Sequence, residues 1–188
     1  SINRFGYFIV TTLDGPSVYN LLKEHRQLSG NVYDIDTRSN KEVWSIKPSA
    51  NLDLTKNHLP STITEGFNHN IKVNFESIGQ EYEESLVHPT LLITMAAKHG
   101  LKLLSSNEVK EKFPLFSHAS DLFKNVYKRY IKINPSDIDV LNLGDSEFEE
   151  LKNYSDLHRY FIFKVDKHQI IPNLTFTKIE ECSQKSSK

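Results

Sequence analysis

The chain has 188 residues and almost no net charge: 23 Lys and Arg face 24 Asp and Glu, for a formal charge of −1. This length allows one domain with a substantial core, and the charge balance argues against a general polyanion binder. The single cysteine, Cys182, excludes an internal disulfide framework and a cysteine-rich zinc site, and it fits a reducing compartment. No apolar run approaches the ~18 residues of a membrane span, so we expect a soluble intracellular protein without a membrane partner.

The first segment is an apolar run that ends in a turn. Residues 5–10 are apolar or aromatic apart from Gly6, which predicts a central strand covered on both faces, as in parallel α/β sheets. Residues 14–17, Asp-Gly-Pro-Ser, break the strand and open a helix, because Pro suits a first helical turn and Asp or Ser can cap it. Such a strand needs neighbours, and nothing precedes it here. We therefore expect the start to be a cut through a larger domain or a chain resuming after missing sequence.

Periodicity and turn residues predict the remaining elements. In chain order they are a short helix closed by Gly30, strands over 31–36 and 42–46 joined in a hairpin, an irregular stretch over 47–69, a strand over 70–78, a helix over 89–99, a strand over 101–104, a helix over 116–131, a polar loop over 134–153, a strand over 160–165 and a frayed end from 178. This order predicts an α/β fold, the carboxyl-terminal half of a doubly wound, Rossmann-like sheet. Residues 1–166 would form this partial domain, with an inserted antiparallel subdomain at about 31–80, and 167–188 would be a tail.

Four segments carry a family resemblance, and they occur in the family's order. Residues 6–15 are similar to the family's fifth sheet strand and the turn after it, and residues 71–79 are similar to the strand of its inserted subdomain. Residues 84–87 and 99–103 are similar to the start and the end of its next helix, and residues 158–164 are similar to its closing strand. Together they resemble the carboxyl-terminal half of the methyltransferase domain of mRNA cap guanine-N7 methyltransferases. The resemblance is strongest to those in capping enzymes of large DNA viruses and related cytoplasmic elements. It implies a cytoplasmic location, the host cytoplasm for a viral protein, or the nucleus for a cellular one.

The resemblance implies two residues that bind the cap guanine. A strand-end glutamate of the family binds the Watson–Crick edge of the base, and Glu84 matches it. A carboxylate accepts from both N1–H and the N2 amino group of guanine, a donor pair that adenine lacks. His158 matches an aromatic near the closing strand that is usually tyrosine, and an imidazole can also stack on a base. Tyr160 and Tyr82 are the alternative aromatics.

Both residues also have plainer interpretations. Glu81, Glu83 and Glu84 form an acidic cluster that would suit a helix start, where the helix dipole favours carboxylates. His158 could simply be a histidine at a strand start, exposed or bonded to a neighbour.

A basic strip is the second candidate site. Tyrosines alternate with cations along the helix predicted over 116–131, which favours contact with an RNA backbone. The cations are Lys124, Lys128, Arg129 and Lys132, and the tyrosines are Tyr127 and Tyr130. The alternative is the solvated face of an amphipathic helix.

The methyl donor implied by the resemblance is S-adenosylmethionine. The chain lacks the family's Asp-x-Gly-x-Gly-like turn and its Gln-Phe-x-x-His-Tyr segment, and its seven glycines are scattered. We therefore expect upstream residues to bind the donor, and we assign no cofactor residue here. The eight histidines show no paired ligand spacing, so we expect no metal site.

The expected function is transfer of a methyl group from S-adenosylmethionine to N7 of the guanine cap of mRNA, with this chain supplying part of the cap-binding wall. The expected partners are capped RNA and either the missing amino-terminal half or a companion capping subunit. A non-catalytic, methyltransferase-like stimulatory subunit is the main alternative. An RNA-binding module that uses the basic strip is the third.

Overall fold

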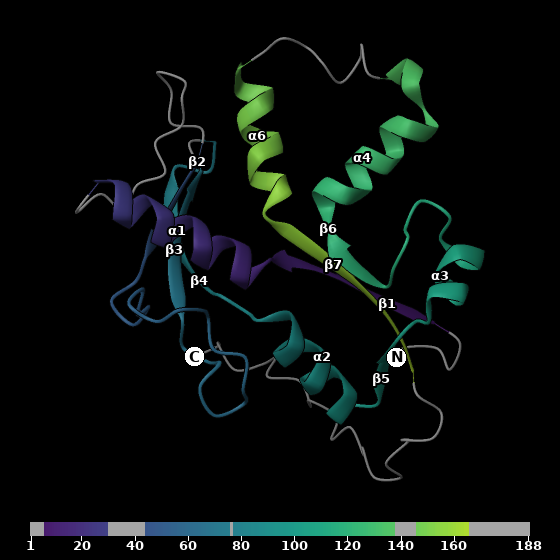
Figure 1. Cartoon of the computed structure of the whole chain (residues 1–188), viewed down its shortest axis with the longest axis horizontal. Coiled ribbons are helices and arrows are strands. Elements are labelled where there is room, and N and C mark those ends of the chain that lie inside the picture. Colours follow the sequence, from purple (N-terminus) through teal and green to yellow (C-terminus); the bar gives the residue numbers. More distant parts are fainter. Residues whose placement is uncertain (1–5, 30–43, 76, 138–145, 166–188) are drawn as a thin grey trace, which may run out of the picture.

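The computed structural model describes residues 6–29, 44–75, 77–137 and 146–165, and it shows a mixed α/β fold with two antiparallel sheets (Figure 1). In the main sheet, β7 (His158–Val165) lies between β1 (Tyr7–Leu13) on one side and β5 (Leu101–Leu103) and β6 (Ser120–Leu122) on the other. Since β1 and β5 both run antiparallel to β7, they run parallel to each other. The smaller sheet has the order β2 (Trp44–Pro48), β3 (Asn70–Phe75) and β4 (Gln80–Ser85).

The expectation of a parallel sheet with β1 at its buried centre is wrong for the described residues. Every strand pair described is antiparallel, and the parallel pairing is limited to the isolated bridge between Asp14 and Val87. Tyr7, Phe8 and Ile9 are 43%, 43% and 54% exposed. The reason is that β1 pairs with β7 along one edge only, and no described strand pairs with the other edge.

The helices begin and end at recognisable signals. Helix α1 (Gly15–Ser29) follows the Asp14 turn, as predicted, and the Asp14 carboxylate accepts from Ser17 N at 3.1 Å. Helix α2 (Pro89–Lys98) confirms the predicted helix and ends before Gly100, whose φ of 73° suits glycine. Helix α3 (Ser106–Lys112), which was not predicted, begins with a capping box between Ser105 and Glu108.

Two predictions in the second half of the chain need correction. The helix predicted over 116–131 begins later, as α4 (Phe123–Ile133), because residues 120–122 form β6 against β7. The loop predicted over 134–153 instead contains the short 3-10 helix η1 (Pro135–Asp137) and α6 (Ser146–Asp156). Helix α6 was not predicted because the segment is mostly polar, although Phe148, Leu151 and Tyr154 recur every three residues.

Two cores hold the sheets. In the first, α1 lies across the small sheet, and its Val18, Tyr19 and Leu22 are buried with Ile46 and Ile71 (Figure 1). In the second, one face of β7 is covered from α3 and α4. The buried residues of this second core are Leu104, Val109, Ala119, Tyr160 and Ile162, and Phe116, Phe123 and Val126 pack against them.

The strand predicted over 70–78 is shorter, ending at Phe75, and the irregular stretch after β2 is confirmed. The predicted strand over 31–36, with its hairpin, and the end of the chain from 166 onward lie outside the described residues. Within the described part, no helix is long and apolar enough to cross a membrane.

Candidate functional site

The start of β7 and the end of α6 form one side of a cavity of about 300 Å³. Its lining residues come from four elements or their ends, namely Thr11, Phe123, Tyr154, Ser155 and His158. A volume near 300 Å³ is at the lower end of the range of about 300–1,000 Å³ for small-molecule pockets. The cavity can therefore hold a group such as one nucleobase.

Tyr154 is the residue around which this site is organised. Its ring packs edge-on against His158 at a centroid distance of 4.8 Å and against Phe75 at 4.6 Å, and it lies 5.3 Å from Trp44. Phe75 and Trp44 belong to the small sheet, whereas His158 begins the last strand of the main sheet. Tyr154 therefore joins the two sheets through aromatic contacts, each worth about 0.5–1.5 kcal/mol beyond area burial.

The backbone of Tyr154 orients the ring of His158. His158 Nδ1 lies 3.0 Å from the carbonyl oxygen of Tyr154. Since a carbonyl only accepts, Nδ1 of His158 is the donor of this hydrogen bond. The half-buried imidazole is thereby held in one orientation at the cavity wall.

Glu84 lies on β4 beside two tyrosines. Alternation along the strand places Glu84 on the same face as Tyr82 and opposite to Glu81 and Glu83, and both Glu84 and Tyr82 are half-buried. The side chains of Tyr82 and Tyr154 lie close enough to shift each other's pKa. The pKa of Tyr82 is raised mainly by burial and, to a smaller extent, by the nearby Glu84 carboxylate. The pKa of Tyr154 is also raised, first by burial and then by Tyr82 and Glu84.

The interpretation of the acidic cluster as a helix start is wrong. Residues 80–85 form a strand, and the next helix begins only at Pro89. The cluster was misread because Glu is depleted in strands, so its presence there favoured another element. Glu84 is therefore a strand-end carboxylate, although it is not among the described residues that line the cavity.

A third residue, Tyr154, lies beside the predicted guanine contacts. Its ring packs against His158, and the Glu84 carboxylate, after burial and Tyr82, raises its pKa. The sequence analysis missed Tyr154 because it follows the predicted loop over 134–153 in a stretch that was assigned no element. Tyr160, the alternative aromatic, is excluded from this role. It is 2% exposed, and its hydroxyl donates to the carbonyl of His118, 2.9 Å away.

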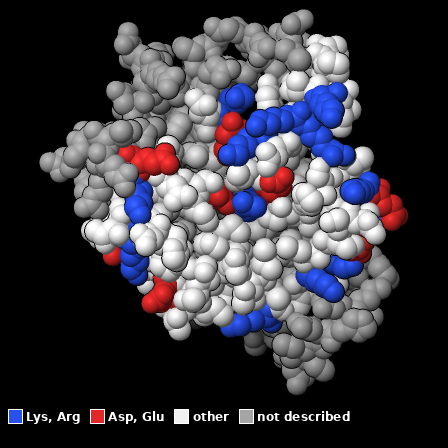
Figure 2. All heavy atoms as spheres, viewed as in Figure 1, with Lys and Arg blue, Asp and Glu red and all other residues white. Residues whose placement is uncertain are grey.

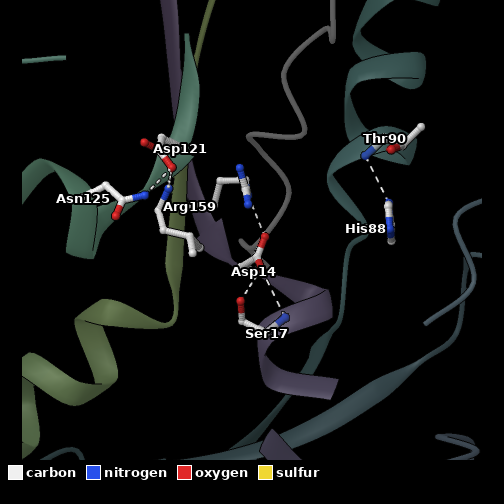
Figure 3. A network of polar contacts seen from close by, with 8 residues as sticks. Asp14, Ser17, His88, Thr90, Asp121, Asn125 and Arg159 are labelled. Atoms are coloured by element: carbon white, nitrogen blue, oxygen red, sulfur yellow. Dashed lines mark hydrogen bonds and ion pairs between the residues drawn. The ribbon is translucent and has the colours of Figure 1, made fainter. Parts of the chain in front are cut away.

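A network of polar contacts lies at the carboxyl end of β1 (Figure 3). Asp14, 3% exposed, accepts from Arg159 Nε at 2.6 Å through one carboxylate oxygen and from Ser17 Oγ at 2.5 Å through the other. Nearby, His88 Nδ1 accepts from Thr90 N at 3.2 Å and caps α2. Burial lowers the pKa of His88, with further lowering by His58 and Arg159 and an opposing effect of Asp14.

The predicted basic strip lies on α4, where Lys and Arg side chains gather on the surface (Figure 2). Lys124, Lys128, Arg129 and Lys132 are all exposed. Arg129 is engaged within the protein, since it donates to Ser117 Oγ at 2.7 Å and to the Pro114 carbonyl at 3.1 Å. Lys124 and Lys128 are thus better placed than Arg129 to contact a ligand.

The turn after β1 does not have the open glycine that a nucleotide-binding turn needs. Gly15, which follows β1, packs against protein: a Cβ added to it would lie 2.6 Å from both Leu59 Cδ2 and the Val87 carbonyl oxygen. Its lack of a side chain therefore serves packing and not the approach of a nucleotide. No group of three His, Cys, Asp or Glu among the described residues could hold a metal ion.

Comparison with models of known protein families gives no match for this sequence, and comparison with curated proteins gives none either.

Proposed function

We propose that this chain forms the cap-guanine wall of an mRNA cap guanine-N7 methyltransferase. The observation that carries the proposal is that the Tyr154 ring of α6 packs against His158 of β7, while the Glu84 carboxylate of β4, after burial and Tyr82, raises the pKa of Tyr154. Glu84 is distant in the sequence from the other two residues, whereas Tyr154 and His158 belong to consecutive elements. The sequence resemblance names Glu84 and His158 independently of this geometry.

The chemistry of these residues suits recognition of guanine. The Glu84 carboxylate would accept from N1–H and the N2 amino group, while the rings of His158 and Tyr154 would pack on the base. Guanine N7 is already nucleophilic, so the site needs no general base. Its contribution is to hold the base in a fixed orientation toward the donor.

The order of the main sheet is compatible with the proposal. Doubly wound sheets often include an antiparallel strand among parallel ones, and here β7 runs against β1 and β5, which are parallel to each other. The outer edge of β1, unpaired among the described residues, is the place where further parallel strands would join.

The donor would be bound outside this chain's described residues, by another part of the protein or by a companion capping subunit. The packing of Gly15 supports that division, and it equally favours the alternative that the chain is a non-catalytic, methyltransferase-like subunit that stimulates a catalytic partner. In both cases the partners are capped RNA and a donor-binding unit.

The test is methyl transfer from labelled S-adenosylmethionine to unmethylated capped RNA, measured on the purified protein together with whatever co-purifies. We expect label on guanine N7. Transfer that requires an added catalytic subunit, and that this chain accelerates, would favour the stimulatory role. Folded protein that neither transfers methyl groups, stimulates transfer nor binds a cap analogue would contradict both.

A further inference from the structure

A second cavity lies between α4 and α6. It has a volume of about 400 Å³ and is mostly apolar, with Phe123, Val126, Tyr127 and Tyr130 on α4 facing Leu151 and Lys152 on α6. These α4 positions recur at intervals of three and four residues, so they form one stripe of the helix. None of the α4 side chains is buried, and Leu151 is 42% exposed. The stripe is thus open to a ligand along the groove between the two helices.

This groove adjoins the cavity beside His158, because Phe123 and Ser155 line both. A ligand whose first base occupies the smaller cavity would therefore extend between α4 and α6. In a capped RNA, the first transcribed nucleotide follows the cap guanine across the phosphate bridge, and the rest of the transcript extends from that nucleotide.

The side chains of the groove suit a nucleobase and its phosphate. Tyr127 offers a half-buried ring, and the Lys152 ammonium lies 5.6 Å from the centroid of that ring. Lys124 and Lys128, one turn before and one residue after Tyr127, are exposed on the same helix. Asp156, the acidic residue of the lining, lies 3.8 Å from the Lys152 ammonium, which offsets its charge.

We propose that the groove between α4 and α6 binds the single-stranded RNA that follows the first transcribed nucleotide, with a base stacked on Tyr127 and phosphates contacted by Lys124 and Lys128. Aromatic rings beside cations on a positively charged face are the usual equipment of single-strand binding sites. This inference rests on the proposed function for the direction of the chain, since the cap guanine marks its 5′ end.

The experiment compares three fluorescent ligands by anisotropy: the dinucleotide GpppA, a GpppA-initiated RNA of about six nucleotides, and the same RNA without a cap. We expect the capped RNA to bind roughly tenfold more tightly than the dinucleotide, as one stacked base and its phosphates would give. Tyr127→Ala should remove that gain and leave dinucleotide binding unchanged. Tyr127→Phe should keep the gain, which separates loss of the ring from loss of folding.

Lys128→Ala should reduce both the gain and its salt dependence, whereas Lys98→Ala, on α2, should change neither. Equal affinities for the dinucleotide and the capped RNA would overturn the inference and leave the cap site standing. An equal loss for both ligands in Tyr127→Ala would also overturn it. If the dinucleotide does not bind but the uncapped RNA does, in a manner that depends on Tyr127, the groove is supported and the proposed function fails.

Discussion

At the scale of single residues, Asp14 is a buried carboxylate whose hydrogen bonds reach α1 and β7. Both carboxylate oxygens are bonded, to Arg159 and to Ser17, and its backbone N–H donates to the Leu157 carbonyl at 2.7 Å. An ion pair in a buried position contributes little by itself, but removing one partner leaves the other without compensation. Asp14 therefore joins β1, α1 and β7 at one point.

The first prediction follows from that position. Asp14→Ala should lower the free energy of unfolding by about 3 kcal/mol, because Arg159 loses its partner and α1 loses its cap. Urea unfolding followed by circular dichroism measures this loss. The matched control is Glu81→Ala, which breaks the exposed pair with Lys72 (3.1 Å) and should cost less than about 1 kcal/mol. Equal losses would contradict the role given to Asp14.

At the scale of elements, α2 depends on a histidine cap. His88 Nδ1 accepts from Thr90 N, so the ring must be neutral at that nitrogen, and burial lowers the pKa of His88 below its usual 6.5. A lowered pKa means that the unfolded chain binds the proton more readily. This contribution to stability is therefore complete above about pH 6.5 and is lost as the pH falls through the lower, folded-state pKa.

The second prediction is a change in pH dependence. His88→Asn keeps an N-cap acceptor without a titrating ring, so its free energy of unfolding should fall less than that of wild type between pH 7.5 and pH 5.5. Urea titrations at the two pH values give the comparison, with His99→Asn as the control at an exposed histidine. An identical pH dependence in wild type and His88→Asn would show that the cap does not carry this effect.

Elements also show how far the sequence alone predicts the fold. Helices α1 and α2 were predicted because their starts and ends carry Pro and Gly at positions that local chemistry dictates. Strands β3 and β7 were predicted from alternation and β-branched or aromatic content. The exposure of β1 was not predictable, because an apolar run does not indicate which edge of a strand is paired or which face is covered. Helix α6 was missed because its polar composition outweighed a weak periodicity.

The candidate site, like the fold, could be predicted from the sequence only in part. Glu84 and His158 were chosen through a family resemblance, and no local property of the sequence pairs them. Tyr154 could not be chosen, because its importance arises largely from contacts with Phe75 and Trp44, which are distant in sequence. Convergence of this kind is a property of the tertiary structure.

At the scale of the whole molecule, the two sheets are joined at the turn after β1. Asp14 bridges to Val87, and Gly15 N donates to the Val87 carbonyl at 3.3 Å, which connects the end of the main sheet to the segment that leaves β4. The close approach requires the absence of a side chain at residue 15.

The third prediction is that Gly15→Ala lowers the free energy of unfolding by about 1–3 kcal/mol, because the new methyl group meets a backbone carbonyl that cannot move aside cheaply. Thermal unfolding monitored by circular dichroism measures the change. Asn20→Ala, at an exposed position of the same helix, should stay within about 0.5 kcal/mol of wild type. A neutral Gly15→Ala would show that the contact between the sheets is looser than the structure indicates.

The central claim, that Glu84 recognises a cap guanine, is tested most directly by binding of GpppA and ApppA, which differ only in the cap base, to wild type, Glu84→Gln and Glu83→Gln. Wild type should prefer GpppA, and Glu84→Gln should weaken its binding roughly ten- to hundredfold, as expected for about 1–3 kcal/mol from a carboxylate that pairs with two donors. Glu83→Gln, on the opposite face of the same strand, should bind like wild type. Equal binding of GpppA by Glu84→Gln and wild type, or no preference of wild type for guanine, would contradict the claim.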